Sequence, residues 1–586
     1  MADIRLYQDY RLSKWTNREI RSDVAVICTI GPAQFSDLGA RIRELAAEGM
    51  NVARINLSHY RLDKNGRADA GGLSQLVEIV RSVRKASDEL NRPVGVMLDL
   101  KGPEIRVAGF TSPGPDAPET GSALSLQPGM ELDLTSRPDY VSNGTAVVRL
   151  AYDGDFEQDI ASQDPRDPLF IDNGGVELEL LEAAADHARV RVRYGETIGL
   201  RKGMNLFNNV RPSAGPPVSD IDRAYLEALL ADTAEFRDAC PVDAVAVSFT
   251  RSRADLASVR AVLEQWRPAD AHRIKLIAKV ESPHCFMKTA DGNPNRFDPT
   301  RLSFDRYENI LTDPLCWAVM VARGDLGVEI APEQVARVQR GLSSRANHAG
   351  KAVIVATQLL MSMLDKRRPS RADVTDIYDA VLGGADALML SEETAVGRFP
   401  VESLSMMRKV AGTAALELVE PREHESYLRK MEDAAGPSGS ATVTGPLGRP
   451  VYCVAQESGS PVVFSYAITG RTLTQIPRYR LSRPLVAVAS DEVTARNLLF
   501  YFGVHPLVVT RRDSSGTILP GFDFPRNVKE FRDFLRSIVR SAQDTGNRFR
   551  FPELEETKPE QMLVGLFGVD EKSALSAARA VVIFRY

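Results

Sequence analysis

Two carboxylates and a lysine end two apolar segments of this chain in a pattern suited to metal-assisted phosphoryl transfer. Lys279 and Glu281 end the segment Lys275–Ser282, and Asp325 lies near the end of Ala318–Gly327. Residues i and i+2 of a strand face the same side, so Lys279 and Glu281 should point together. For this pair alone, a structural ion pair is the simpler explanation. Asp325 favours a Mg²⁺ site of two carboxylates, with the lysine beside a bound phosphoryl group.

A second group of polar side chains ends the segment Met50–His59. Arg54, Asn56 and Ser58 alternate along it, and Asp99 ends the next apolar segment. An amide oxygen, a hydroxyl and a carboxylate suit a monovalent cation, and an arginine adds phosphate recognition. A hydrogen-bonded polar plug explains the same residues equally well, so both interpretations stay open from these residues alone.

Two more side chains have a chemical and an ordinary explanation. Thr357 ends the run Ala352–Gln358, where it could orient a water or relay a proton, although a buried threonine is usually only hydrogen-bonded. Lys202 lies where an inserted segment rejoins the main pattern. It could reach a nucleotide phosphate, although a solvated loop lysine is more common.

Eight short apolar runs must position these residues, and helical patterns separate most of them. Continuous runs of Val, Ile, Leu and Ala are typical of buried parallel strands. Eight of them predict an α/β fold, the (β/α)8 TIM barrel, whose active site lies where the strands end. The runs are Val24–Pro32, Met50–His59, Val94–Gly102, Asp243–Phe249, Lys275–Ser282, Ala318–Gly327, Ala352–Gln358 and Ala387–Thr394.

An inserted segment interrupts the barrel pattern after its third run. Residues 107–201 contain period-two alternation, as in Met130–Leu134, Val176–Leu180 and Ala188–Tyr194. Such alternation predicts a small β domain, here a β-barrel lid placed to close over the active site. The barrel then comprises residues 24–106 and 202–416, and residues 1–23 form an N-terminal arm that we expect to be partly helical.

The last part of the chain, residues 417–586, predicts a C-terminal α/β domain. A Gly/Pro/Ser-rich linker is expected at Glu432–Pro450, and a helix at Asn527–Gln543. The apolar runs that alternate with helical patterns are Val451–Ala455, Leu485–Ala489, Pro506–Val509, Met562–Phe567 and Ala580–Phe584.

Composition narrows the class of protein. The 586 residues are 44% hydrophobic and 26% charged, as in ordinary globular enzymes. A net charge of −5 argues against nucleic-acid and membrane-surface partners. No apolar stretch reaches the length of a membrane span, the N-terminal residues lack an apolar signal core, and the five cysteines are dispersed. We therefore expect a cytoplasmic protein with reduced thiols.

The motifs at the strand ends resemble those of the pyruvate kinase family over about residues 24–410. The resemblance implies transfer of the phosphoryl group of phosphoenolpyruvate to ADP, which gives pyruvate and ATP, with Mg²⁺ or Mn²⁺ and usually K⁺. It also implies a homo-oligomer, a tetramer in the family. Matching stretches include CTIGPA (28–33), GMNVARINLSH (49–59), LDLKGPEIR (98–106), KGMNL (202–206), IAKVES (277–282), MVARGDLGVEI (320–330), ATQLLMSM (356–363) and ALMLSEETAVGRFPVES (387–403).

The resemblance also implies a role for each matching residue. Lys279 would stabilise the transferring phosphoryl group, and Glu281 and Asp325 would hold the divalent cation. Backbone N–H groups of Gly324 and Asp325 would bind the substrate carboxylate, and Thr357 would assist protonation of the enolate. The expected K⁺ ligands are Asn56, Ser58, Asp99 and the carbonyl of Leu100. The expected phosphate and nucleotide contacts are Arg54, His59, Arg106 and Lys202.

Two positions depart from the family pattern and keep other functions open. Leu100 stands where K⁺-dependent members usually carry Thr, whereas Glu104 is the choice associated with K⁺ dependence. Glu392 replaces the usual Gly of the SGET motif. The alternatives are a regulatory paralogue with reduced turnover and a Mg²⁺-dependent lyase that acts on phosphoenolpyruvate or pyruvate on the same barrel.

Overall fold

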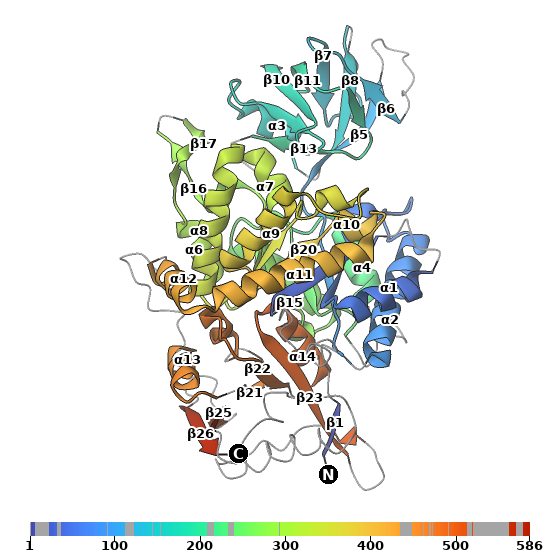
Figure 1. The fold of residues 1–586 in the computed structure, drawn as a ribbon. Coiled ribbons are helices and arrows are strands. Elements are labelled where there is room, and N and C mark those ends of the chain that lie inside the picture. The colour runs from blue at the N-terminus through green and yellow to red at the C-terminus, as the bar shows by residue number, and fades with distance from the viewer. Residues whose placement is uncertain are drawn as a thin grey trace.

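A computed structural model shows three bodies stacked along one axis (Figure 1), with a small β barrel at one end, a large α/β barrel in the middle and a sheet domain at the other end. The structure describes residues 2–5, 23–31, 37–90, 92–111, 122–142, 144–152, 154–207, 216–231, 240–291, 293–433, 448–460, 462–467, 470, 473–489, 491–512, 518–519, 562–569 and 578–585.

All eight predicted runs form strands of one closed parallel barrel, which confirms the TIM-barrel prediction. In barrel order the strands are β14 (Ala244–Val247), β15 (Lys275–Val280), β18 (Cys316–Ala322), β19 (Ala352–Ala356), β20 (Ala387–Leu390), β2 (Ala25–Thr29), β3 (Val52–Asn56) and β4 (Gly95–Asp99). The helices of the barrel region are α1 (Leu38–Glu48), α2 (Ala70–Glu89), α4 (Asp220–Leu230), α5 (Arg253–Trp266), α6 (Asp305–Leu311), α7 (Arg323–Glu329), α8 (Val335–His348), α9 (Arg371–Leu382), α10 (Glu392–Ala395) and α11 (Pro400–Leu418).

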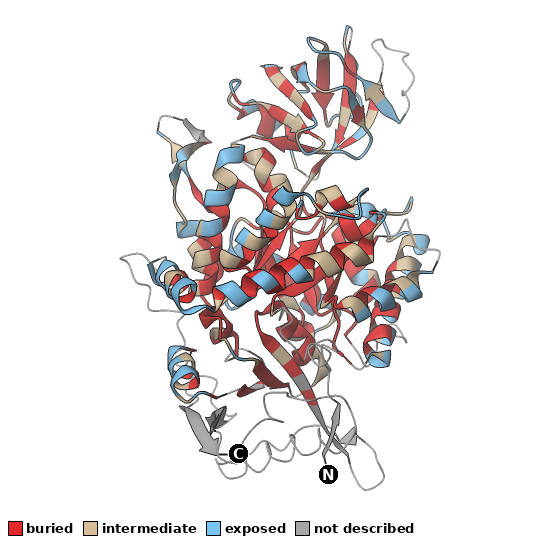
Figure 2. Cartoon of the chain, in the orientation of Figure 1, coloured by how far each residue is buried: buried red, intermediate tan, exposed pale blue. Residues whose placement is uncertain are grey.

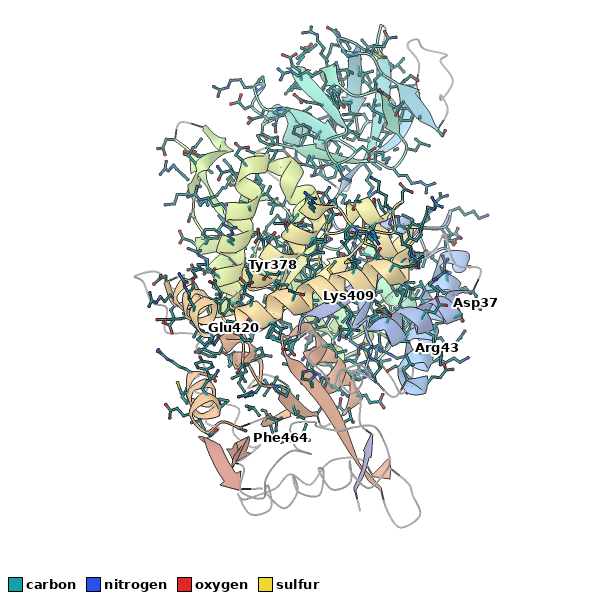
Figure 3. The ribbon with its side chains drawn as sticks, viewed as in Figure 1. Asp37, Arg43, Tyr378, Lys409, Glu420 and Phe464 are labelled. Carbon is teal, nitrogen blue, oxygen red and sulfur yellow. The ribbon has the colours of Figure 1, made fainter. Side chains whose placement is uncertain are left out.

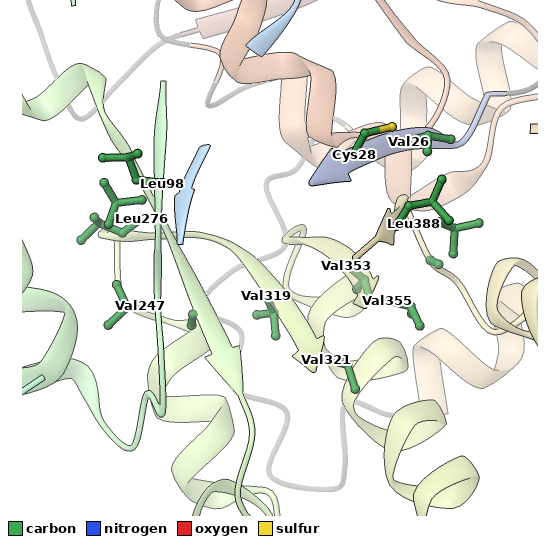
Figure 4. Close-up of a cluster of buried hydrophobic side chains, with 14 of the residues drawn as sticks. Val26, Cys28, Leu98, Val247, Leu276, Val319, Val321, Val353, Val355 and Leu388 are labelled. Carbon is green, nitrogen blue, oxygen red and sulfur yellow. The ribbon is translucent and has the colours of Figure 1, made fainter. Parts of the chain in front are cut away.

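Alternate residues of each barrel strand belong to two separate apolar cores. Val353 and Val355 of β19 pack toward the helices, together with Val319, Val321 and other side chains shown in Figure 4. Their neighbours along the strand, such as Ile354, lie in the second core inside the barrel. The strands are therefore buried on both faces (Figure 2), which explains why their sequences are continuous apolar runs.

The outer helices are amphipathic and present charged side chains to solvent. Arg43 of α1 and Lys409 of α11 are exposed, and Figure 3 shows them on the helical layer. Tyr378 of α9 donates a hydrogen bond to Glu417 of α11, and so joins two neighbouring helices of this layer.

On two neighbours of strand β14, strands β15 and β4, the interior row changes from apolar to charged toward the end of the strand. On β15 the interior residue Ile277 is followed two residues later by Lys279, and two residues after that by Glu281. On β4 the interior residue Met97 is followed by Asp99. Because the period of a strand is two, the same alternation that fills the barrel interior aims these charges into its open end.

The inserted segment folds as a second closed barrel above that end (Figure 1). Its strands, in order, are β10 (Val176–Ala183), β11 (Ala188–Tyr194), β7 (Glu131–Thr135), β8 (Ala146–Ala151), β5 (Ile105–Thr111), β13 (Gly203–Leu206) and β9 (Leu169–Ile171). The pair β6 (Ala123–Ser125) and β12 (Thr197–Gly199) and the helix α3 (Phe156–Ala161) complete it. The chain leaves the large barrel along β5 and returns along β13, and these two strands pair antiparallel. We call this body the lid.

The C-terminal domain is a sheet of order β1, β23, β22, β21, β25, β26, with β24 paired to β23. Its core strands are β21 (Val463–Ala467), β22 (Leu485–Ala489) and β23 (Val504–Arg512), joined by β24 (Ile518–Leu519), β25 (Met562–Val569) and β26 (Ala578–Arg585). The helices are α12 (Pro421–Asp433), α13 (Gly448–Glu457) and α14 (Glu492–Asn497). The predicted helix Asn527–Gln543 lies outside the described residues.

One local expectation is wrong. The apolar run Val451–Ala455 lies inside helix α13, where Val451 and Ala455 are buried one turn apart. A short apolar run cannot by itself distinguish a strand from a buried helix face. The first strand of this sheet that follows α13 is Val463–Ala467. Residues Ala2–Arg5 of the arm form strand β1, which extends the sheet beside β23. Residues 6–22 of the arm lie outside the described residues, so its partly helical character stays a prediction.

Between barrel strands β15 and β18, a hairpin of β16 (Met287–Ala290) and β17 (Asn293–Leu302) precedes helix α6. Among the described residues, no helix is both long and apolar enough to cross a bilayer.

Two buried arginines of the C-terminal domain attach it to the closed end of the barrel. Arg480 is fully buried, and its guanidinium donates to Asp386 Oδ1 at 2.6 Å and to the Gly384 carbonyl at 2.6 Å. Arg496 donates to Asp243 Oδ1 at 2.7 Å. Asp386 and Asp243 precede strands β20 and β14, and each also accepts a backbone N–H from a neighbouring strand segment. Both carboxylates are therefore satisfied partly by the barrel and partly by the C-terminal domain.

We predict that Arg480→Met lowers the free energy of unfolding by about 3–5 kcal/mol, because it leaves the Asp386 carboxylate buried without its charge partner. Arg483→Ala, three residues along at an exposed position, should change it by less than about 0.5 kcal/mol. Urea denaturation of the two variants measures both values. Equal effects from the two substitutions would contradict the assignment.

Candidate active site

Lys279 is the central charge at the open end of the barrel. Its Nζ lies 2.8 Å from Asp99 Oδ1 and 2.8 Å from Glu281 Oε1, and donates to Ser248 Oγ at 2.7 Å. The side chain is buried, and burial by itself lowers the pKa of the ammonium. The charges of Asp99 and Glu281 outweigh this, so the pKa of Lys279 is raised and the lysine stays protonated.

Arg54 and Asp99 form a second buried ion pair beside this lysine. Arg54 Nε donates to Asp99 Oδ2 at 2.7 Å, and its Nη1 donates to Thr29 Oγ1 at 2.9 Å. Burial acts to raise the pKa of Asp99, but Lys279 and Arg54 lower it below its ordinary value. One carboxylate therefore holds both cations in place.

The four expected K⁺ ligands come from neighbouring strand ends. Asn56 and Asp99 are direct partners in the register of β3 and β4. Asn56 Oδ1 accepts the N–H of Ser58 at 3.1 Å, and the carbonyl of Leu100 accepts the hydroxyl of Ser248 at 2.6 Å. Carbonyl and carboxylate oxygens keep further lone pairs after one such bond, so this oxygen set still fits a monovalent cation.

Ser248 was not predicted as a site residue. It connects two groups that were predicted, the Lys279 ammonium and the Leu100 carbonyl. It follows strand β14, receives a hydrogen bond from Lys279 and donates one to the Leu100 carbonyl. The only signal for it was the polar ending of the fourth apolar run. The next residue, Phe249, has a left-handed φ of 49° and donates its N–H to Glu281 Oε2 at 2.7 Å. The end of β14 thus fixes both Lys279 and Glu281.

Glu281 and Asp325 lie near enough for the charge of Asp325 to act on Glu281, which also pairs with Lys279 at 2.8 Å. Burial raises the pKa of Glu281, and the nearby charge of Asp325 adds to this despite the opposing effect of Lys279. Burial and the charge of Glu104 likewise raise the pKa of Asp325. In the described part of the chain, no three His, Cys, Asp or Glu side chains form a metal-binding group. The pair fits a cation such as Mg²⁺, which needs only one or two carboxylates.

Thr357 lies against the first turn of helix α7. Its Oγ1 accepts the N–H of Gly324 at 2.7 Å and donates to the Ala356 carbonyl at 2.6 Å. Thr357 has a φ of 69°, an unusual left-handed conformation for a β-branched residue that stores about 1–3 kcal/mol of strain. The N–H of Gly324, expected to bind a substrate carboxylate, is thus bonded to the threonine in this state.

The expected phosphate and nucleotide contacts gather where the lid joins the barrel. Arg106 Nε donates to Glu104 Oε2 at 2.5 Å and its Nη1 donates to the Arg201 carbonyl at 2.7 Å. Lys202 Nζ lies 2.8 Å from Asp172 Oδ1 of the lid. His59 is exposed at the rim; partial desolvation, followed by the charges of Arg54 and Arg106, lowers its pKa. The three residues therefore occupy one rim, with His59 favoured in its neutral form.

Comparison with known proteins places this site in a family. A sequence model of the family described as "Pyruvate kinase, barrel domain" matches residues 21–404. The chain belongs to the pyruvate kinase family. Pyruvate kinase of Methylorubrum extorquens is 31% identical over 483 residues, covering 82% of this chain and 86% of that protein. Pyruvate kinase PKLR of Homo sapiens is 32% identical over 490 residues, covering 83% of this chain and 75% of that protein. Pyruvate kinase of Thermococcus litoralis is 31% identical over 481 residues, covering 82% and 87%.

The similarity to these pyruvate kinases extends beyond the barrel, because the relatives match a larger share of the chain than the barrel model does. The family assignment agrees with a phosphotransferase on a TIM barrel, and it confirms the resemblance drawn from the strand-end motifs. The role of each individual residue stays a proposal.

We predict that Thr357→Val lowers the free energy of unfolding by about 1–3 kcal/mol, because the N–H of Gly324 loses its acceptor. Thr357→Ser keeps that acceptor and should cost less than about 1 kcal/mol. Denaturant unfolding of both variants gives the comparison. If the valine variant were as stable as the serine variant, the hydrogen bond from the Gly324 N–H would make no contribution to the free energy of unfolding.

Proposed function

We propose that this chain is an active pyruvate kinase that transfers the phosphoryl group of phosphoenolpyruvate to ADP, giving pyruvate and ATP in glycolysis. The observation that supports this most is the placement of Lys279. Its ammonium is held by Asp99, Glu281 and Ser248, at the end of the strand next to the one that leads to Asp325. Phosphoryl transfer needs a fixed cationic charge that stabilises the transferring group and carboxylates that hold a metal ion.

In the proposed reaction, the bond between phosphorus and the enol oxygen of phosphoenolpyruvate breaks, and a terminal oxygen of ADP bonds to the same phosphorus. Lys279 stabilises the negative charge on the transferring group. Arg54, already fixed by Asp99 and Thr29, contacts the phosphoryl oxygens. Arg106, Lys202 and His59 contact the nucleotide at the rim, where Lys202 exchanges its ion pair with Asp172 for a phosphate.

Glu281 and Asp325 would hold Mg²⁺ or Mn²⁺, which when bound polarises the phosphoryl oxygens and neutralises developing charge. Asn56, Ser58, Asp99 and the Leu100 carbonyl would hold K⁺. Proton delivery to the enolate carbon belongs to the side of the site that carries Thr357. The backbone of Gly324 and Asp325 receives the substrate carboxylate when the Gly324 N–H leaves the threonine.

We propose further that the lid, with residues 107–201 as its body, closes on the hinge strands β5 and β13 and excludes water, so that the phosphoryl group passes to ADP rather than to water. The five free cysteines support a reducing, cytoplasmic location. We propose a homo-oligomer, as the family resemblance implies.

A coupled assay with phosphoenolpyruvate, ADP, Mg²⁺ and K⁺ tests the activity, and Lys279→Met should lower kcat about 1,000-fold, because a single preorganised electrostatic group supplies up to that factor. Lys288→Met, at an exposed lysine of strand β16, is the matched control and should leave kcat unchanged. Calorimetric binding of phosphoenolpyruvate without ADP-dependent turnover would instead favour a regulatory paralogue, and product formation without nucleotide would favour a lyase.

Replacing K⁺ with tetramethylammonium in the same assay tests the monovalent site. We expect kcat to fall about 10-fold, because the ion adds positive charge beside the phosphoryl group. An unchanged rate would show that Arg54 and Lys279 alone supply the cationic charge, as Leu100 in place of threonine would allow.

A further inference from the structure

Thr29 ends strand β2 and lies between the two strands that flank β2 in the barrel. Its register partner on β3 is Arg54, and on the other side the preceding residue, Cys28, pairs with Leu390 of β20. The threonine is 3% exposed. A buried hydroxyl without partners would be costly, and this hydroxyl bonds to both neighbouring strands.

The hydrogen bonds of this hydroxyl have a fixed direction. Arg54 Nη1 donates to Thr29 Oγ1 at 2.9 Å, and Oγ1 donates to the Leu390 carbonyl at 2.9 Å. A guanidinium can only donate and a carbonyl can only accept. The single hydroxyl proton therefore points to Leu390 and a lone pair points to Arg54, so the donors run one way from β3 through β2 to β20.

The segment that follows β20 also holds the backbone around Thr29. Thr394 of helix α10 donates its hydroxyl to the Thr29 carbonyl at 2.9 Å. A Cβ atom on Gly31 would lie 2.3 Å from the Ala395 carbonyl oxygen, so the backbone after β2 packs directly against the same helix. Strand β20 and helix α10 thus place both the side chain and the main chain of Thr29.

The hydroxyl and the Asp99 carboxylate hold the Arg54 guanidinium at two different nitrogens. Asp99 Oδ2 accepts from Nε at 2.7 Å, and Thr29 accepts from Nη1. With Asp99 alone, the planar group could turn about one hydrogen bond. A second carboxylate in place of Thr29 would neutralise the arginine, whereas a hydroxyl fixes it and leaves its charge. A guanidinium carries five N–H donors, so the donors not used by these two residues are left for phosphoryl oxygens.

We infer that Thr29 is a positioning residue that fixes the plane of the Arg54 guanidinium toward a phosphoryl group and links that plane to β20 and α10. The inference rests on the proposed function in taking Arg54 as a phosphoryl contact. Thr29 itself touches no substrate in this arrangement and acts only through the arginine.

Two complementary substitutions in the coupled assay test this role. Thr29→Val keeps the volume of the side chain and removes the hydroxyl, whereas Thr29→Ser keeps the hydroxyl and removes the methyl group. Thr29→Val should lower kcat/KM for phosphoenolpyruvate about 100-fold, as expected for about 1 Å of misplacement, with KM for ADP within about 2-fold of the parent. Thr29→Ser should stay within about 3-fold of the parent in kcat/KM. A packing role would reverse the order of the two variants.

The matched control is Thr135→Val in the lid. Thr135 is also a buried threonine, and its hydroxyl donates to the Asp186 carbonyl at 2.7 Å. The substitution removes a buried hydroxyl that contacts no cation of the site, so kcat/KM should stay within about 2-fold of the parent.

A double-mutant cycle shows whether Thr29 acts through Arg54. In an Arg54→Met background, Thr29→Val should change kcat/KM by less than about 2-fold, because the group that it positions is gone. The same loss in both backgrounds would overturn the inference.

The outcomes separate this inference from the proposed function. If the parent turns over and Thr29→Val behaves like Thr135→Val, the inference is wrong and the proposed function stands. If calorimetry shows that the parent binds phosphoenolpyruvate without turnover, the proposed function falls and the cycle is measured on binding. Thr29→Val should then weaken that binding about 10-fold in the parent and leave it unchanged in Arg54→Met. If the parent neither binds nor converts phosphoenolpyruvate, both fall.

Discussion

The pairing of Lys279 with Asp99 and Glu281 is the interaction on which the rest of the site depends. Each of these three charges is buried, and an isolated charge in such surroundings would cost several kcal/mol. Together they satisfy one another, and Arg54 and Ser248 complete the network. Because Asp99 is shared by Lys279 and Arg54, the proposed phosphoryl-binding side of the site and the proposed monovalent-cation side cannot be arranged independently.

The two ends of the barrel accommodate their buried charges in different ways. Toward the closed end the interior positions are apolar and small, as at Ala244, Ala318 and Ala352. On β15 and β4, charged side chains follow the apolar interior residues Ile277 and Met97 two positions later, as Lys279 and Asp99. The polar groups at the closed end, Asp243 and Asp386, precede their strands and are covered by arginines of the C-terminal domain. At the closed end, arginines of the C-terminal domain pair with the buried carboxylates. At the open end, Lys279 and Arg54 of the barrel itself pair with Asp99.

The strands and the main site residues could be predicted because both leave strong local patterns. Burial on two faces makes the strands continuous apolar runs, and a spacing of two places Lys279 with Glu281 and Arg54 with Asn56. Ser248 escaped prediction because a single hydroxyl after a strand has no periodic signature. The contact between Asn205 of strand β13 and Glu329 of helix α7 was not predicted either. The two hydrogen-bonded residues are 124 positions apart, and only the folded lid brings them together. The strand prediction at Val451–Ala455 was wrong because five apolar residues fit a helix as well as a strand.

The apolar core inside the barrel does not stop at the barrel. It continues without interruption into the C-terminal domain through Trp317, Leu498 and Phe500, and Trp317 donates its indole N–H to the Asn497 carbonyl at 3.1 Å. The C-terminal domain therefore serves as the floor of the barrel. A fragment that ended after α11 would expose the end of this core, and would leave Asp386 without Arg480 and Asp243 without Arg496. The large barrel of this chain is therefore not a separable module. Any variation of the C-terminal domain must preserve the residues that close the end of the barrel, such as Leu498 and Phe500, while it changes the outer sheet.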